Sequence, residues 1–196
     1  MTVASTEAAT DALSGGFADA PVAAARAFRA ALEAMSRPGR IETVAGAAPP
    51  APASVAAGVL LLTLADATTP VHLAGAHDHG PLRDWVTFHT GAPLVGAARA
   101  VFALGTWEGL QPLDRFAIGT PEFPDRSVTL IVELARLADA GMRLTGPGIR
   151  EAVHLSLPEV AAFATNRARF PLGFDTFLTC GDRLAGLPRS TRVEGA

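Results

Sequence analysis

Val128-Thr129-Leu130-Ile131-Val132-Glu133-Leu134 decides the fold class, because it has the strongest strand pattern in the chain. The segment is nearly continuous in apolar residues, and most of these have branched side chains. Such a run is typical of a strand in a sheet that is covered on both faces. We therefore expect a strand at this position, with other elements packed on each side of its sheet.

Shorter strand and helix patterns surround this segment. Further strands are predicted at 40–44, 71–73, 100–104, 143–145, 153–155, 174–179 and 183–187, the last two joined by a hairpin turn at 181–182. Helices are predicted after residue 20 and at 55–64, 81–89 and 157–167, with a shorter one at 107–116 that Pro112 limits. Helices separate the strands early and strands crowd together late, which indicates an α/β fold with a mixed central sheet flanked by helices.

Two of the predicted helices have clear end signals. Pro21 lies in the first turn of the first helix, and Arg37-Pro38-Gly39 ends it. Ser156 stands three residues before Glu159, which is the spacing of a capping box at the start of the last helix. The first helix is amphipathic, because apolar residues recur along it at spacings of three and four: Val22, Ala25, Phe28, Leu32 and Met35.

Length and composition fit one soluble domain. The chain has 196 residues, of which 49% are hydrophobic and 18% charged, so it is unlike a disordered chain. We expect residues 1–15 to be a mobile N-terminal tail and residues 16–194 to form a single domain. No apolar run approaches the roughly 20 residues of a membrane-spanning helix. The start of the chain lacks the basic residues of a targeting signal, which favours a cytoplasmic location.

The missing residue types exclude several chemistries. The chain has no lysine, so it offers neither the lysine of a phosphate-binding P-loop nor the Schiff-base lysine of a pyridoxal-phosphate enzyme. Cys180 is the single cysteine, which excludes an intrachain disulfide and a cysteine-based metal site; we interpret it as a small buried hydrophobe. A net charge of -3 without an arginine stripe argues against nucleic-acid binding. We expect no cofactor.

The histidines offer one weak metal signal. His77-Asp78-His79 would place two imidazoles on one side of a strand, and His72 and His89 could complete a site if the fold brought them near. The alternative is a solvated loop bounded by glycines. Because two nearby imidazoles are weak support for a metal, we favour the loop.

A glycine turn and three arginines beside prolines are the other candidates. Gly146-Pro147-Gly148 could present backbone N–H groups to a phosphate, although a plain turn between strands is the simpler interpretation. Prolines near Arg37, Arg169 and Arg189 restrict the backbone there, so these side chains could clamp a phosphate. The alternative is that they form surface ion pairs. For Arg189 we favour a role in anchoring the chain terminus. The candidates for anion binding or anchoring are Arg37, Gly146, Gly148, Arg169, Arg189 and Thr191.

Six groups of residues, in this order and spacing, resemble one family. These are Phe28-Arg29 with Ala34-Met35-Ser36-Arg37-Pro38-Gly39; Leu61-Leu62-Thr63-Leu64 with Asp66, Thr69 and Pro70; Phe88-His89-Thr90 with Pro93-Leu94; Leu144-Thr145-Gly146 with Gly148-Ile149; Phe170-Pro171-Leu172-Gly173 with Asp175; and Leu187-Pro188-Arg189-Ser190-Thr191. Over about residues 16–194 the chain resembles the PhnH family, the H subunit of the bacterial carbon–phosphorus lyase system.

The resemblance carries expectations of its own. It implies a fold like the large domain of pyridoxal-phosphate-dependent transferases without the cofactor site. It also implies a core complex with the G, I and J subunits, in which an alkylphosphonate is joined to the ribose of ATP and the C–P bond is later cleaved. It assigns no catalytic residue to this subunit.

Two hypotheses for the molecular role follow. The first is a structural, non-catalytic subunit of the phosphonate-degrading complex. The second is an enzyme component that binds ATP or alkylphosphonate in the formation of ribose 1-phosphonate 5-triphosphate. For the isolated chain we expect a homodimer, as the resemblance implies and because 49% hydrophobic residues are more than a chain of this size easily hides.

Overall fold

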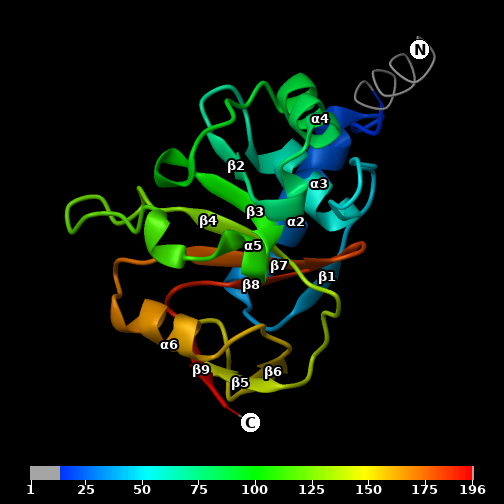
Figure 1. Cartoon of the computed structure of the whole chain (residues 1–196). Helices are drawn as coiled ribbons and strands as arrows, with labels where there is room; N and C mark the ends of the chain where they lie inside the picture. Colours follow the sequence, from blue (N-terminus) through cyan, green and yellow to red (C-terminus); the bar gives the residue numbers. More distant parts are fainter. Residues whose placement is uncertain (1–13, 196) are drawn as a thin grey trace.

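The computed structural model describes residues 14–195 (Figure 1). The helices are α2 (Ala20–Ser36), α3 (Val55–Leu64), α4 (Gly80–Thr90), α5 (Trp107–Leu110) and α6 (Ala161–Ala168), with short 3-10 turns η1 (Gly75–His77), η2 (Ala97–Arg99) and η3 (Leu113–Arg115). The strands are β1 (Ile41–Thr43), β2 (Val71–Leu73), β3 (Phe102–Thr106), β4 (Thr129–Glu133), β5 (Met142–Thr145), β6 (Val153–Leu155), β7 (Asp175–Cys180), β8 (Arg183–Leu187) and β9 (Arg192–Glu194).

A six-stranded mixed sheet forms the centre of the domain, in the order β1-β8-β7-β4-β3-β2. Strands β2, β3, β4 and β7 run parallel, while β8 and β1 are antiparallel to their neighbours. The segment that decided the fold class forms β4, between β3 and β7, with Thr129 opposite both Phe102 and Asp175. The α/β class and the mixed sheet are thus confirmed.

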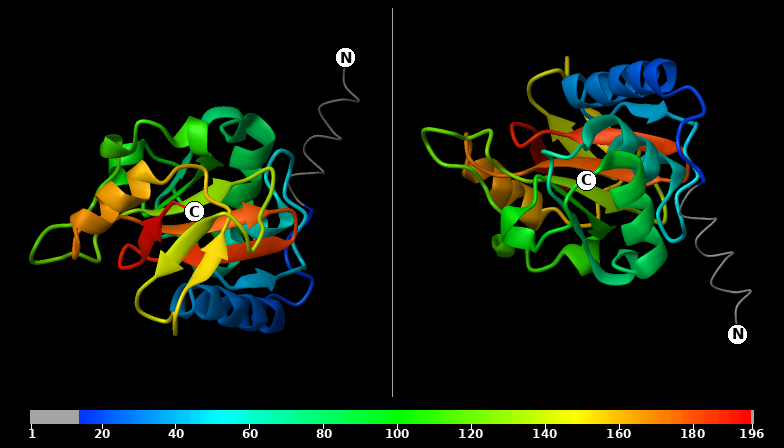
Figure 2. Two further views of the ribbon diagram at one scale, coloured as in Figure 1. Left: turned by 90° about the horizontal axis from the view of Figure 1, so that it is seen from below. Right: turned by 90° about the horizontal axis from the view of Figure 1, so that it is seen from above.

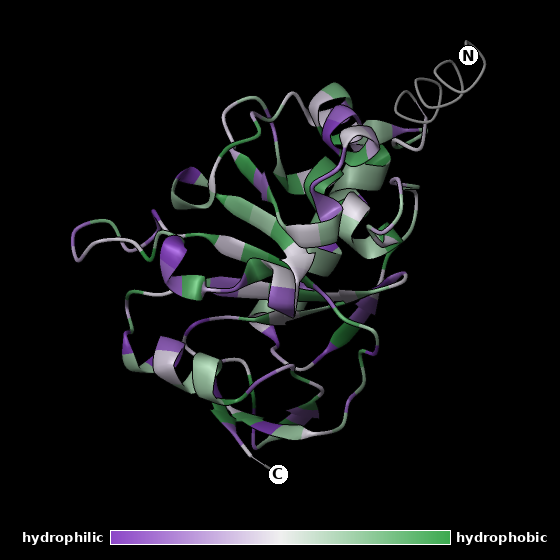
Figure 3. Cartoon of the chain, in the orientation of Figure 1, coloured by the Kyte–Doolittle hydropathy of each residue, from purple (hydrophilic) through white to green (hydrophobic). Residues whose placement is uncertain are grey.

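The central sheet is buried on both faces, as the continuous apolar pattern of β4 predicted. Ile131 packs into a core with α2, α3 and α4, whereas Leu130 and Val132 pack into a second core with α5 and α6. All three residues are fully buried. Figure 3 shows the hydrophobic colour along much of β3 and β4. Successive strand residues point to opposite faces, so a strand buried on both faces is apolar at nearly every position.

Helix α2 packs on the sheet through its small residues, and its large apolar side chains face outward. Ala27, Ala31 and Ala34 are buried, while Val22, Phe28 and Leu32 of the predicted apolar side are 45%, 53% and 57% exposed. The close approach of α2 to β8 explains this arrangement. A Cβ atom on Gly186 of β8 would lie 2.6 Å from the carbonyl carbon of Ala34, so only small residues fit between the helix and the strand.

A second, smaller sheet lies below the central one in Figure 1, in the order β6-β5-β9. The pairing of β5 with β6 was predicted only as two strands flanking a turn, and β9 was not predicted. Thr145 pairs with Arg192, so residues far apart in the chain build this sheet. In Figure 2 its strands β5 and β6 lie beside the central sheet, near the C-terminus.

The predicted start of the last helix was wrong. Helix α6 begins at Ala161, four residues after the predicted start at 157, and its N-cap is Val160 instead of Ser156. The Ser156 hydroxyl instead accepts a hydrogen bond from the N–H of Ala138 over 2.9 Å. The Glu159 carboxylate accepts one from Trp107 Nε1 over 3.1 Å. Both side chains of the supposed capping box are therefore used in contacts with distant segments.

The start of the described chain is held against α4. The carbonyl oxygen of Ser14 accepts hydrogen bonds from Trp85 Nε1 and His89 Nε2, each over 3.0 Å. The Gly15 carbonyl accepts one from the N–H of Ala48 over 2.8 Å. The rest of the predicted tail, residues 1–13, lies outside the described residues. Among the helices of residues 14–195, none is long and apolar enough to cross a membrane.

Candidate functional site

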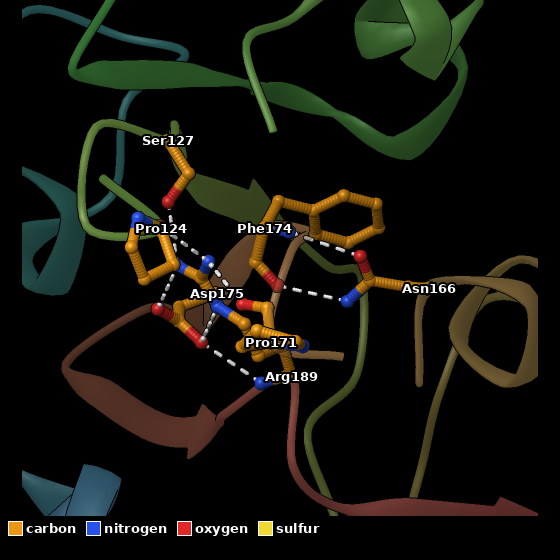
Figure 4. A network of polar contacts seen from close by, with 7 residues as sticks. All are labelled: Pro124, Ser127, Asn166, Pro171, Phe174, Asp175 and Arg189. Carbon is orange, nitrogen blue, oxygen red and sulfur yellow. Dashed lines mark hydrogen bonds and ion pairs between the residues drawn. The ribbon is translucent and has the colours of Figure 1, made fainter. Parts of the chain in front are cut away.

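Arg189 lies at the centre of the densest polar network among the candidate residues (Figure 4). Its Nη2 donates to Asp175 Oδ2 over 2.6 Å and to Ser127 Oγ over 2.5 Å, and its Nε donates to Asp175 Oδ1 over 3.2 Å. Its Nη1 donates to the carbonyl oxygens of Pro124 and Pro171 over 2.9 and 3.3 Å. A guanidinium has five N–H donors. All five therefore have protein acceptors, and none is free for a phosphate.

The network joins segments that are distant in the sequence. The Asp175 carboxylate also accepts a hydrogen bond from the backbone N–H of Arg189 over 2.8 Å, so both backbone and side chain of Arg189 are fixed. Next to it, the Asn166 side chain donates to the Phe174 carbonyl over 2.8 Å and accepts from the Phe174 N–H over 2.9 Å. The loop before β4, the loop before β7, helix α6 and the chain after β8 thus meet at one place.

An apolar cavity of about 430 Å³ lies beside this network. Its wall includes Phe102, Thr129 and Asp175, the first residues of β3, β4 and β7. Asp175 is the only charged residue in this wall, and its carboxylate is already bound by Arg189. The cavity therefore offers no free cation to an anionic ligand.

The other two arginines lie in different surroundings. Arg37 is exposed, and its Nε lies 3.4 Å from Glu33 Oε2. Arg169 lines a cavity of about 320 Å³ together with Glu159, Asn166 and Asp114. The described structure gives the Arg169 guanidinium no hydrogen bond or ion pair. The three arginines beside prolines thus line no common cavity among those described here.

The glycines of the predicted turn face other segments of the chain. A Cβ atom on Gly148, which has a φ of +80°, would lie 2.0 Å from the carbonyl oxygen of Ser36 at the end of α2. A Cβ atom on Gly146 would lie 3.3 Å from the Ser190 carbonyl oxygen and 3.5 Å from Thr191 Cα. Thr191 itself is buried, and its hydroxyl has no hydrogen-bond partner among the described residues. The space beside the turn is therefore filled by protein.

The histidines do not assemble as the metal hypothesis required. His77 ends the turn η1 rather than lying on a strand, and it is 1% exposed with neither ring nitrogen hydrogen-bonded in the described structure. His89 packs instead against Trp85 and Phe88 on α4. Within residues 14–195, no group of three or more histidine, cysteine or acidic side chains is arranged to hold a metal ion.

Burial lowers the pKa of His77, and this effect outweighs the Glu133 carboxylate, which raises it. A desolvated imidazole favours its neutral form. Cys180, at the end of β7, is partly buried and packs against the second core. The surroundings of Cys180 therefore do not identify it as a nucleophile, and those of His77 do not identify it as a general base.

Two arginines beside a polar cavity at β2, Arg83 and Arg99, were not predicted as site residues. Arg83 and Arg99 line this cavity together with His72 and Asp78. No short motif identifies them, because the four residues come from β2, the loop after η1, α4 and η2. The one feature of the sequence that could have pointed to this site is that Asp78 and Arg83, which form an ion pair in the structure, are only five residues apart.

The fold and site define a class of protein: a mixed-sheet α/β domain in which Arg189, Gly146 and Gly148 contact other segments of the chain rather than an open pocket. Comparison with known families is more specific. The model of the family described as bacterial phosphonate metabolism protein (PhnH) matches residues 15–194. The chain therefore belongs to the PhnH family, and the resemblance found in the sequence is confirmed.

Two curated relatives agree with this membership. The chain is 40% identical over 193 residues to the alpha-D-ribose 1-methylphosphonate 5-triphosphate synthase subunit PhnH of Rhizobium meliloti (strain 1021), covering 92% of this chain and 95% of that protein. It is 30% identical over 180 residues to the putative C-P lyase subunit protein HtxG of Stutzerimonas stutzeri, covering 85% of this chain and 84% of that protein. The similarity thus spans nearly the whole domain.

Proposed function

We propose that this chain is a subunit of the carbon–phosphorus lyase machinery of phosphonate catabolism, with a structural rather than a catalytic role. The observation that carries this proposal is the similarity over nearly the whole chain to two proteins that are both named as subunits of such systems. The network around Arg189 supports the structural role, because it leaves that guanidinium no free donor. Its partners are the G, I and J subunits, in the cytoplasm.

The exposed side of α2 is the surface that we propose for subunit contacts. Phe28 and Leu32 are four residues apart, so they lie one above the other, and exposed Ala25 and Val22 continue the row toward the start of α2 at spacings of three. Val22, Phe28 and Leu32 are about half exposed, so the row forms an apolar stripe. Exposed apolar patches on soluble proteins often mark interfaces. In the isolated chain the stripe pairs with a second copy to give a homodimer, and in the complex a partner subunit replaces that copy. A monomer mass by light scattering at micromolar concentration would contradict the homodimer.

The fold relationship to the large domain of pyridoxal-phosphate-dependent transferases remains part of this proposal. The absence of lysine from the whole chain removes the residue on which that cofactor chemistry depends. The second hypothesis, an enzyme component that binds ATP or alkylphosphonate, depended on arginines converging on one pocket. Arg37, Arg169 and Arg189 give it no support, because no described cavity contains two of them.

Growth on methylphosphonate tests the proposed function. The host is a bacterium with an intact phosphonate pathway from which the gene for the H subunit has been deleted. We expect this chain to restore growth when methylphosphonate is the sole phosphorus source, and an empty vector to fail. Growth on inorganic phosphate is the control for viability. A chain that is well expressed and folded but restores no growth would contradict the proposal.

A further inference from the structure

The structure contains a polar cavity of about 360 Å³ at the β2 edge of the central sheet. Strand β2 is the last strand of that sheet, and the segment that follows α4 runs along it, with Val71 bridged to Leu94. The cavity lies on this edge, away from the Arg189 network. Its wall is formed by His72, Leu73, Asp78, Arg83, Leu94, Val95, Gly96 and Arg99.

One of the two guanidinium groups in this wall has a fixed orientation. Arg83 Nε lies 2.5 Å from Asp78 Oδ1, and Arg83 Nη2 lies 3.0 Å from Asp78 Oδ2. The hydrogen bond from Arg83 lowers the pKa of the Asp78 carboxyl, so the pair stays charged at neutral pH. This bidentate contact uses two of the five guanidinium donors. The other three N–H groups of Arg83 have no protein acceptor in the described structure.

The second guanidinium, that of Arg99, has no hydrogen bond or ion pair in the described structure. His72 adds a polar ring to the same wall. Its Nδ1 lies 3.0 Å from the Val95 carbonyl oxygen, and its Nε2 has no hydrogen-bond partner among the described residues. With neutral histidine the wall has two positive charges and one negative charge. Asp78 is neutralised by Arg83, so the unbalanced charge is that of Arg99.

We propose that this cavity binds a phosphate or phosphonate group, with Arg99 and the free N–H groups of Arg83 as its donors. A guanidinium matches the oxygens of a tetrahedral phosphorus anion through two parallel hydrogen bonds. Asp78 orients Arg83 and is itself a positioning residue. The same group could belong to free phosphate, to an alkylphosphonate or to a sugar phosphate, and a cavity of this size accommodates the larger of these.

A surface ion pair without a ligand is the competing interpretation of Arg83 and Asp78. Arg143 and Glu194 are such a pair, 2.6 Å apart, and they line none of the described cavities. The pair at β2 differs in two respects: it borders a cavity, and the same cavity contains a second arginine without a partner. These two differences favour a ligand site.

Isothermal titration calorimetry of the isolated chain tests the proposal with inorganic phosphate, methylphosphonate and ribose 5-phosphate, at constant ionic strength. We expect at least one of the three to bind, and Arg99→Gln to weaken that binding about tenfold or more, since a hydrogen bond to a charged group contributes about 1.5–3 kcal/mol. The matched control is Arg150→Gln, which removes the same charge from an exposed arginine in the loop between β5 and β6. It should leave the affinity within about twofold, because exposed charges far apart are screened by salt.

The pattern of binding identifies the source of the group. Equal binding of all three compounds means that the phosphorus anion alone is recognised. Tighter binding of methylphosphonate or of ribose 5-phosphate means that the methyl group or the sugar is recognised as well. No binding of any compound to the wild-type chain would overturn the proposal. Equal weakening by Arg99→Gln and Arg150→Gln would also overturn it, because it would show unspecific attraction. Either failure leaves the subunit assignment standing, since growth on methylphosphonate tests that assignment separately.

Discussion

Arg189 and Asp175 form a bidentate ion pair in which Nη2 lies 2.6 Å from Oδ2 and Nε lies 3.2 Å from Oδ1. The Arg189 side chain is only 12% exposed, so the pair is largely shielded from water. It ties the chain after β8 to the first residue of β7. The next strand, β9, then pairs with β5 in the second sheet. The pair therefore holds together the place where the two sheets meet.

We predict that Arg189→Lys lowers stability. Lysine keeps the charge but has three donors instead of five, so at least two of the hydrogen bonds of Arg189 are lost. The expected loss is about 2 kcal/mol, or a fall in Tm of about 4–8 °C for a chain of this length. Thermal unfolding followed by circular dichroism measures it, with Arg150→Lys as the matched control. A variant with unchanged Tm that no longer binds ATP or methylphosphonate would instead support a phosphate clamp.

We predict that stability falls as the pH drops below the ordinary histidine pKa of 6.5, in part because of His77. Burial lowers the pKa of His77 in the folded chain, so below that pH the unfolded chain binds a proton that the folded chain does not. His77→Phe should reduce the difference in Tm between pH 7.5 and pH 5.5. The control is His154→Gln, at an exposed position. The same difference in wild type and His77→Phe would refute this role.

We predict that Gly186→Ala destabilises the fold by about 1–3 kcal/mol through overpacking. The added Cβ atom would lie 2.6 Å from backbone atoms of Ala34, so α2 must move away from β8. Gly80→Ala is the control, because its Cβ atom would meet nothing within 4 Å. Urea unfolding compares the two variants. Equal stability of both would show that α2 is not held as closely as the structure indicates.

We predict that Phe28→Ser combined with Leu32→Ser weakens the proposed homodimer at least about tenfold, because each large apolar side chain contributes about 1.5–3 kcal/mol when buried. Both side chains are exposed in the single chain, so its fold should remain. Sedimentation equilibrium measures the dissociation constant. Phe123→Ser, at an exposed phenylalanine outside the stripe, is the control. Unchanged dimerisation of the double variant would exclude α2 as the interface.

The elements of the central sheet were predictable because their signals are local. The three middle residues of β4 are all apolar, and α3 was predicted at its observed bounds because its residues are apolar on nearly every face. The orientation of α2 was not predictable. Its outward and inward sides both contain apolar residues, and only Gly186, about 150 positions later, determines that the alanines face the sheet.

Contacts between distant segments explain the remaining misses. Ser156 and Glu159 have the spacing of a capping box, but Ala138 and Trp107 bind these side chains instead. The three residues of β9 have one apolar side chain between two charged ones, so they give no apolar strand pattern. Five of the six candidate site residues were chosen for a local turn or a nearby proline, and Thr191 lies two residues after one of them. Their partners, such as Ser127 for Arg189, come from loops that no local pattern connects.

Co-purification tests the central claim most directly. The four subunits G, H, I and J are produced together, with this chain as the H subunit and an affinity tag on the I subunit. We predict that this chain elutes with the G, I and J subunits as one species in size-exclusion chromatography, in a fixed ratio measured by native mass spectrometry. Elution of the G, I and J subunits without this chain, although it is folded and present in the lysate, would contradict the account.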